Sequence, residues 1–335
     1  MYDNLGRLDE ALTHHKLAYE LSCRSGNLSN ASMICGNYAC NRIDAGDLQD
    51  ADRSLLQGLQ LVGAYDEFGA HVGTLQVRRP LCLCHLGRYA EAPDQAERSV
   101  VSMQRHQIGR LNDARLRLAS CWWHLGQWSR LAQVLGTVVL DAQTLPAIRS
   151  GHARLRWHCA RAVTAGSADT AAARQRLKAA LAAMVDGERP DLQLPLLIEL
   201  TADQAPADAM RQLDAVCTEA TRLGHQGSVL AARVRSAAVV APVDPVRARR
   251  DALAALALAE RHQTTALLPA ELWLHSARAL EAAGERARAR EVAATGRQWV
   301  EATAAEHVPK AFRDSFRHRN PINRDLLALA ARVQA

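Results

Sequence analysis

The stretch Leu5-Gly6-Arg7-Leu8-Asp9-Glu10-Ala11 returns about every forty residues along this chain. It is repeated as Ala45-Gly46-Asp47-Leu48-Gln49-Asp50-Ala51 and as Leu86-Gly87-Arg88-Tyr89-Ala90-Glu91-Ala92, and its first half returns as Leu125-Gly126-Gln127-Trp128. Weaker copies contain Gly166 and Gly284. Successive glycines are 40, 41, 39 and 40 residues apart, and the last interval, 118, is close to three periods. A fixed period of this size is typical of a solenoid of stacked helix pairs.

Each glycine is expected to end one helix, because glycine readily takes the left-handed conformation that closes a helix. First helices of the pairs are predicted near 28–45, 66–86, 109–125, 146–165, 190–203, 225–241 and 267–283. Second helices are predicted near 8–24, 47–62, 88–105, 127–143, 168–186, 206–223, 245–262 and 285–304. Two pairs lack the glycine, but Pro206 and Asp244-Pro245 keep the period, since Asp caps a helix and Pro fits its first turn.

The domain organisation follows from this spacing. Residues 1–306 are predicted to form about seven and a half helix pairs, of which the first is incomplete, and residues 307–335 a basic tail and a capping helix. Only five residues precede Gly6, whereas a first helix needs about fourteen. The first pair would then leave an apolar helix face uncovered. We therefore expect a fragment, a mis-started gene product, or a chain that depends on another subunit.

The pattern resembles the tetratricopeptide repeat (TPR), in which small residues let the two helices of a pair, A and B, approach closely. The small positions of helix A hold Ala39, Ala119, Cys159 and Ala277. Those of helix B hold Ala11, Ala51, Ala92, Ala171 and Ala289. The turns between A and B hold Gly6, Gly46, Gly87, Gly126, Gly166 and Gly284. Pro80 departs from the pattern at a small helix A position and is expected to kink or shorten its helix.

The period exceeds the family's basic repeat of about 34 residues. Longer repeats of this kind resemble the C-terminal sensor region of MalT-like bacterial signalling ATPases and transcription regulators, and also bacterial peptide-sensing repeat proteins. The resemblance implies an all-α, right-handed superhelical solenoid that binds a protein or peptide without catalysis. It also implies a regulator whose ATPase or DNA-binding module lies outside this chain. The alternatives are a free-standing receptor for a short acidic peptide and a basic nucleic-acid-binding helical protein.

The composition limits the fold class, the source and the cellular compartment to be expected. The 335 residues are 48% hydrophobic and 23% charged, which is normal for a folded soluble protein, and only 4% aromatic, which disfavours a β-rich fold. Arginine outnumbers lysine by 38 to three, a bias that favours a GC-rich bacterial source. The eight cysteines form no C-x-x-C pair, so we expect a reducing cytoplasm. No signal peptide or membrane span is visible, and the net charge of +6 permits an acidic partner without requiring one.

A concave groove is the first candidate for function, because helix A lines the concave face in the family that the chain resembles. The residues expected to bind a partner there are Asn37, Arg78, Arg117, Trp123, Arg156, Trp157 and Arg235. A ladder of guanidinium groups would bind carboxylates or phosphates, and the two tryptophans would add an aromatic platform. The alternatives remain open that so many arginines align by chance and that the tryptophans pack in a core.

Other chemistry is weakly indicated. No phosphate-binding G-x-x-x-x-G-K-S/T, G-x-S-x-G, H-E-x-x-H or G-x-G-x-x-G motif is present, so neither catalysis nor a cofactor is expected. No metal site is expected either, since Cys82 and Cys84 diverge on a helix. The segment 307–324 has a net charge of +4 with histidines neutral and could contact nucleic-acid phosphates, although a solvated face is the preferred explanation. Its charged residues are Lys310, Arg313, Asp314, Arg317, Arg319 and Arg324.

Overall fold

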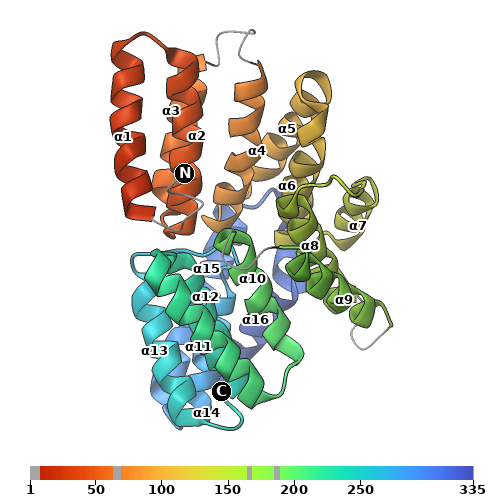
Figure 1. Cartoon of the computed structure of the whole chain (residues 1–335). Helices are drawn as coiled ribbons and strands as arrows, with labels where there is room; N and C mark the ends of the chain where they lie inside the picture. The colour runs from red at the N-terminus through yellow and green to blue at the C-terminus, as the bar shows by residue number, and fades with distance from the viewer. Residues whose placement is uncertain (1–7, 63–68, 164–167, 185–188, 335) are drawn as a thin grey trace.

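A computed structural model describes residues 8–62, 69–163, 168–184 and 189–334 (Figure 1). These residues form helices joined by short turns and contain no β-strand. In chain order the elements are α1 (Leu8–Arg24), α2 (Leu28–Asp44), α3 (Leu48–Val62), α4 (Gly69–His85), α5 (Ala92–His106), η3 (Ile108–Arg110), α6 (Leu111–His124), α7 (Trp128–Gly136), α8 (Pro146–Val163), α9 (Ala168–Ala182), α10 (Pro190–Leu200), η4 (Thr201–Asp203), α11 (Pro206–Leu223), α12 (Gln226–Val240), α13 (Pro245–Ala259), α14 (Glu271–Ala282), α15 (Arg286–Glu306), η5 (Lys310–Phe312), η6 (Ser315–Arg319) and α16 (Pro321–Gln334).

The all-α prediction is confirmed, and most predicted helices end within a few residues of the observed ones. Two differ for local reasons. Helix α5 starts at Ala92 and not near 88, because Pro93 fits the first turn of a helix. Helix α7 ends at Gly136 and not near 143, since a glycine followed by three β-branched residues is a poor continuation. Pro80 lies inside α4 without shortening it, so that part of the expectation was wrong.

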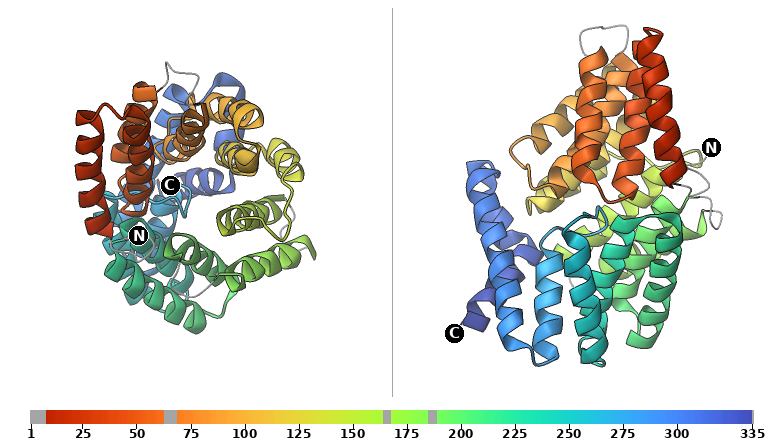
Figure 2. Two further views of the ribbon diagram at one scale, coloured as in Figure 1. Left: turned by 45° about the horizontal axis from the view of Figure 1, so that its top comes forward. Right: turned by 90° about the vertical axis from the view of Figure 1, so that its left-hand side faces the viewer.

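The helices wind into a right-handed superhelix whose inner wall is formed by the A helices. Each of α2, α4, α6, α8, α10, α12 and α14 packs against the next in this series. No comparably extensive contact joins successive B helices in the described part of the chain. In a curved stack the inner radius is the shorter one, so the helices that touch their counterparts line the concave side. Figure 2 shows this ring of helices from above.

The superhelix returns onto itself, so that α1–α6 lie against the second half of the chain (Figures 1 and 2). The peptide N–H of Gln263 donates to the carbonyl of Gly46 at 2.7 Å. A Cβ on Gly126 would lie 2.6 Å from the carbonyl oxygen of Ser315, and one on Gly87 3.6 Å from Trp299. The turns between helices A and B in the first half therefore rest on backbone and side chains of the second half.

The repeated small residues lie in the core. Those described at the packing positions, apart from Cys159 and Ala171, are at most 2% exposed: Ala11, Ala39, Ala51, Ala92, Ala119, Ala277 and Ala289. Ala171 is exposed and does not lie in the core. Cys159 is half-buried. The turn glycines Gly46, Gly87, Gly126 and Gly284 have positive φ, as expected for a residue that closes a helix. The expected packing residues Gly6 and Gly166 lie outside the described residues.

The C-terminal segment connects the two halves. Helix α16 packs against α14 and α15. Before it, the ring of Phe316 lies 5.1 Å from that of Tyr89, and the ring of Phe312 lies 5.6 Å from that of Trp122. The side-chain amide of Asn320 donates to the carbonyl of His124 at 2.9 Å. This segment therefore holds α15 and α16 against the turns of the first half.

Candidate functional site

A pocket of about 230 Å³ lies between α2, α4 and η3. Because α2 and α4 are A helices, it belongs to the inner side of the superhelix. Its lining residues come from α2, from α4 and from the turn that leads into α6: Ser32, Met33, Gly36, Asn37, Thr74, Leu75, Arg78, Gln107 and Arg110. The structure thus brings together two of the predicted groove residues, Asn37 and Arg78.

Two guanidinium groups stand on the wall of this pocket. The side chains of Arg78 and Arg110 make no hydrogen bond or ion pair with any residue in the described ranges. Gly36 leaves room for the first of them, because a Cβ there would lie 2.9 Å from Nη1 of Arg78. Guanidinium groups left without a protein partner in a concave site can bind an anionic group, and a planar carboxylate fits their paired N–H donors.

The pocket also contains buried polar atoms without a partner. Ser32 is 0% exposed, and neither its Oγ nor Oε1 of Gln107 has a hydrogen-bond partner within the described protein. Buried polar groups are normally paired, so such atoms at a pocket wall point to a ligand. Ser32 can donate or accept, and Oε1 of Gln107 only accepts. The pocket therefore suits a ligand that combines a carboxylate with an N–H donor.

Arg117 of α6, another of the predicted groove residues, does not line this pocket. Its guanidinium lies 3.3 Å from the carboxylate of Asp113, so its charge is partly compensated. Burial raises the pKa of the Cys40 thiol, and the charges of Arg78 and Arg117 oppose that rise. Both guanidinium groups therefore act on the same part of α2.

The sequence analysis missed Ser32, Gln107 and Arg110 as pocket residues. Arg110 carried a weak signal, since it precedes Arg117 by seven residues and the two would share a face of the helix predicted near 109–125, although the structure places Arg110 in η3. Gln107 carried none, because its position depends on the turn between α5 and α6.

The aromatic platform predicted from Trp123 and Trp157 is wrong. Trp157 is 1% exposed and packs in a core with α9 and α10, and Trp123 is 5% exposed. The ring of Trp123 stacks on that of His158 at 4.1 Å. The prediction assumed an open groove along the whole superhelix, but the inner faces of the middle helices pack against each other.

Arg235 was also predicted as a partner-binding residue and is instead buried in an ion cluster. It is 7% exposed, and its Nη2 lies 3.2 Å from Glu271 and 3.8 Å from Glu199. Burial alone would raise the pKa of Glu199, but His158, Arg154 and Arg235 outweigh it and hold that pKa below its usual range. Arg235 is therefore paired within the protein and is not available to bind a ligand.

Arg156 lies apart from the pocket. It is half-buried, and its Nε contacts Nε2 of His152 at 3.4 Å. Burial, together with the charges of Arg156 and Arg176, lowers the pKa of His152 to about 4. The predicted ladder of arginines therefore does not form one continuous surface.

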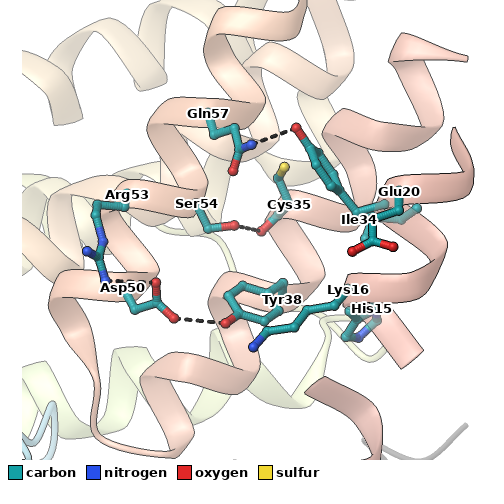
Figure 3. Close-up of a pocket in the computed structure, with 11 residues that line it drawn as sticks. His15, Lys16, Glu20, Ile34, Cys35, Tyr38, Asp50, Arg53, Ser54 and Gln57 are labelled. Atoms are coloured by element: carbon teal, nitrogen blue, oxygen red, sulfur yellow. Dashed lines mark hydrogen bonds and ion pairs between the residues drawn. The ribbon is translucent and has the colours of Figure 1, made fainter. Parts of the chain in front are cut away.

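A second hollow of about 420 Å³ lies between α1, α2 and α3 (Figure 3). Several of its polar groups pair with each other: Tyr38 donates to Asp50 at 2.8 Å, and Gln57 donates to Tyr19 at 2.6 Å. Burial raises the pKa of Cys35 to about 11, so its thiol is a poor nucleophile. The hollow is larger than the pocket at Arg78 but offers a ligand fewer unpaired groups.

The basic tail is largely engaged within the protein. Arg317 lies 2.8 Å from Glu301, Arg313 donates to the carbonyl of Ala305 at 2.6 Å, and Arg324 pairs with Asp325 at 2.9 Å. These pairs weaken the nucleic-acid alternative.

Over the described ranges, no group of three or more His, Cys, Asp or Glu is placed to bind a metal ion. No helix there is both long and apolar enough to span a bilayer.

No protein-family model matches the chain, and no curated protein is similar to it in sequence. Several solved structures match the chain. One is a Rap protein complexed with competence and sporulation factor, with a TM-score of 0.55, 10% identity, and coverage of 100% of this chain and 98% of that one. Another is a tetratricopeptide repeat protein from Parabacteroides merdae ATCC 43184, with a TM-score of 0.44, 14% identity, and coverage of 90% and 98%. At 10% identity the likeness to the Rap protein shows the helical solenoid fold and nothing finer.

Proposed function

We propose that this protein is a non-catalytic TPR-like scaffold that binds a carboxylate-bearing peptide or protein segment in the pocket between α2, α4 and η3. The observation that carries the proposal is the pair of uncompensated guanidinium groups, Arg78 and Arg110, on the wall of one pocket. A carboxylate would bind them through charge-assisted hydrogen bonds. Gln107 Oε1 would accept an N–H of the same ligand, and a peptide supplies both groups.

The similarity to Rap supports this proposal at the level of shape, because a solenoid with the same course over the whole chain holds a bound factor. The wider setting of the proposal is the sensor region of a bacterial cytoplasmic regulator. A ligand that prefers one conformation of the superhelix would then shift the equilibrium of an ATPase or DNA-binding module carried outside these repeats.

An array of acidic decapeptides tests the proposal. Each peptide is spotted in two forms, one with its carboxylates and one in which they are replaced by the matching amides. Four proteins are compared: wild type, Arg78→Gln, Arg110→Gln and, as a charge-matched control, Arg98→Gln. Arg98 is exposed on α5, away from the pocket. We expect carboxylate-dependent binding by wild type and the control, and at least about a tenfold loss in the pocket variants, since a hydrogen bond to a charged group contributes about 1.5–3 kcal/mol. The same binding by all four proteins would refute the proposal.

A further inference from the structure

A separate cavity of about 220 Å³ lies where the C-terminal end of α4 meets the second half of the superhelix. His85 and Leu86 enter it from α4. The remaining walls come from α12, from residues 259–269, from α14 and from α15. The cavity is therefore built by both halves of the superhelix, and it shares no lining residue with the pocket at Arg78.

Most of the wall is apolar. Leu230, Val234, Leu267 and Leu268 are each at most 4% exposed. The rings of Trp273 and Trp299 lie 5.3 Å apart, are tilted by 34° to each other and form an aromatic side of the cavity. The lining residues that the structure describes include no Asp, Glu, Lys or Arg. Such a cavity has no carboxylate, ammonium or guanidinium group to compensate an ion, so it favours an uncharged occupant.

His85 supplies a polar contact with two unpaired nitrogens; His262, Gln263 and Thr264 are the other polar lining residues, and Nδ1 of His262 also has no partner among the described groups. His85 is 6% exposed, and neither of its ring nitrogens has a hydrogen-bond partner among the described protein groups. Burial, together with the charges of Arg154 and Arg117, lowers the pKa of His85 to about 3. The imidazole is therefore neutral at pH 7, with one nitrogen as donor and the other as acceptor. The ring of His124 packs edge-on against it at 4.6 Å and limits its rotation.

We propose that this cavity binds a small, neutral, flat molecule that is mostly apolar and has one hydrogen-bonding group that pairs with His85. The volume sets the size, because a cavity of about 150 Å³ with similar walls takes up benzene. A cavity of 220 Å³ thus has room for a fused bicyclic ring. An occupant would touch both halves of the superhelix and so favour their closed arrangement, which should raise the melting temperature. The inference does not depend on peptide binding.

Indole and indene provide a matched pair of probes, since the two rings have the same shape and only indole has an N–H donor. Calorimetric titration of wild type should show saturable binding of indole, about fivefold tighter than indene, the ratio expected for one neutral hydrogen bond. His85→Leu should abolish this preference. Ala259→Phe, which fills the cavity, should remove binding of both probes, whereas the control Ala257→Phe, at an exposed position of α13, should leave both unchanged.

Three results would overturn the proposal. The first is the absence of saturable indole binding up to the solubility limit. The second is equal indole binding by Ala259→Phe and Ala257→Phe. The third is an equal affinity of wild type for indole and indene, because His85 would then make no hydrogen bond to the occupant. That comparison needs no variant, so it remains decisive even if His85→Leu does not fold, which melting by circular dichroism will show.

Discussion

Replacing Gly46 by alanine should weaken the contact between the two halves of the superhelix. Gly46 has φ +77°, and a Cβ there would lie 2.8 Å from the carbonyl oxygen of Gln263 and 2.9 Å from the peptide nitrogen of Gly227. Both neighbours are backbone atoms, so they cannot rotate away. Gly284 is the matched control, because its φ is +81° and a Cβ added there would meet no other part of the described protein within 4 Å.

The expected magnitudes follow from this difference. An alanine in the left-handed conformation costs about 1–2 kcal/mol, and both variants have this cost. In the Gly46 variant the two backbones must also move apart. This breaks the 2.7 Å hydrogen bond from Gln263 to Gly46, which contributes about 1 kcal/mol, and loosens the packing around that bond. We therefore expect a loss of about 3 kcal/mol for Gly46→Ala and about 1 kcal/mol for Gly284→Ala.

Thermal unfolding followed by circular dichroism measures both effects. At about 2 °C per kcal/mol in a large domain, the melting temperature should fall by about 6 °C for Gly46→Ala and by about 2 °C for Gly284→Ala. Equal decreases in the two variants would refute the reasoning, because the left-handed backbone would then account for the whole effect and the contact between the halves would contribute nothing.

Three further predictions concern buried polar groups. The pKa of His85 is about 3 in the folded protein and near 6.5 in the unfolded chain, so the stability that depends on the neutral ring is complete above pH 6.5 and is lost as pH falls. In urea titrations, His85→Gln should therefore reduce the slope of the unfolding free energy between pH 6 and 4 by about 1.4 kcal/mol per pH unit. Asn320→Ala should lower the free energy of unfolding by about 2 kcal/mol, since it removes a helix cap and the hydrogen bond to the carbonyl of His124. The control Asp244→Ala removes a helix cap alone and should lower it by about 1 kcal/mol in the same assay. Glu199→Gln should cost about 3 kcal/mol by urea unfolding, because it leaves buried cations unpaired, and an unchanged midpoint would contradict this.

The local elements of the fold could be predicted because each depends on a few neighbouring residues. The turn glycines and the Asp244-Pro245 cap mark helix ends directly, and the observed α11 and α13 begin where Pro206 and Pro245 predict. Helix α7 shows the limit of this reasoning, since the forty-residue period suggested a longer helix than Gly136 permits.

The long-range arrangement could not be predicted in the same way. Gly46 and Gln263 are more than two hundred residues apart, and no periodic pattern indicates that they meet. Nor does the period tell which neighbouring side chains cover a given position. Arg78 lines the pocket between α2, α4 and η3, whereas Arg235 is paired with Glu199 of α10 and Glu271 of α14, and Trp157 is packed against α9 and α10. A sequence period gives the face of a helix but not the element that covers it.

The central claim is that the uncompensated charge of Arg78 selects a carboxylate in the pocket between α2, α4 and η3. The most direct test is calorimetric titration of one array-selected peptide, as its carboxylate and as its amide, against wild type, Arg78→Gln and Arg98→Gln. We predict that wild type and Arg98→Gln prefer the carboxylate by about tenfold or more and that Arg78→Gln loses this preference. An undiminished preference in Arg78→Gln would contradict the account.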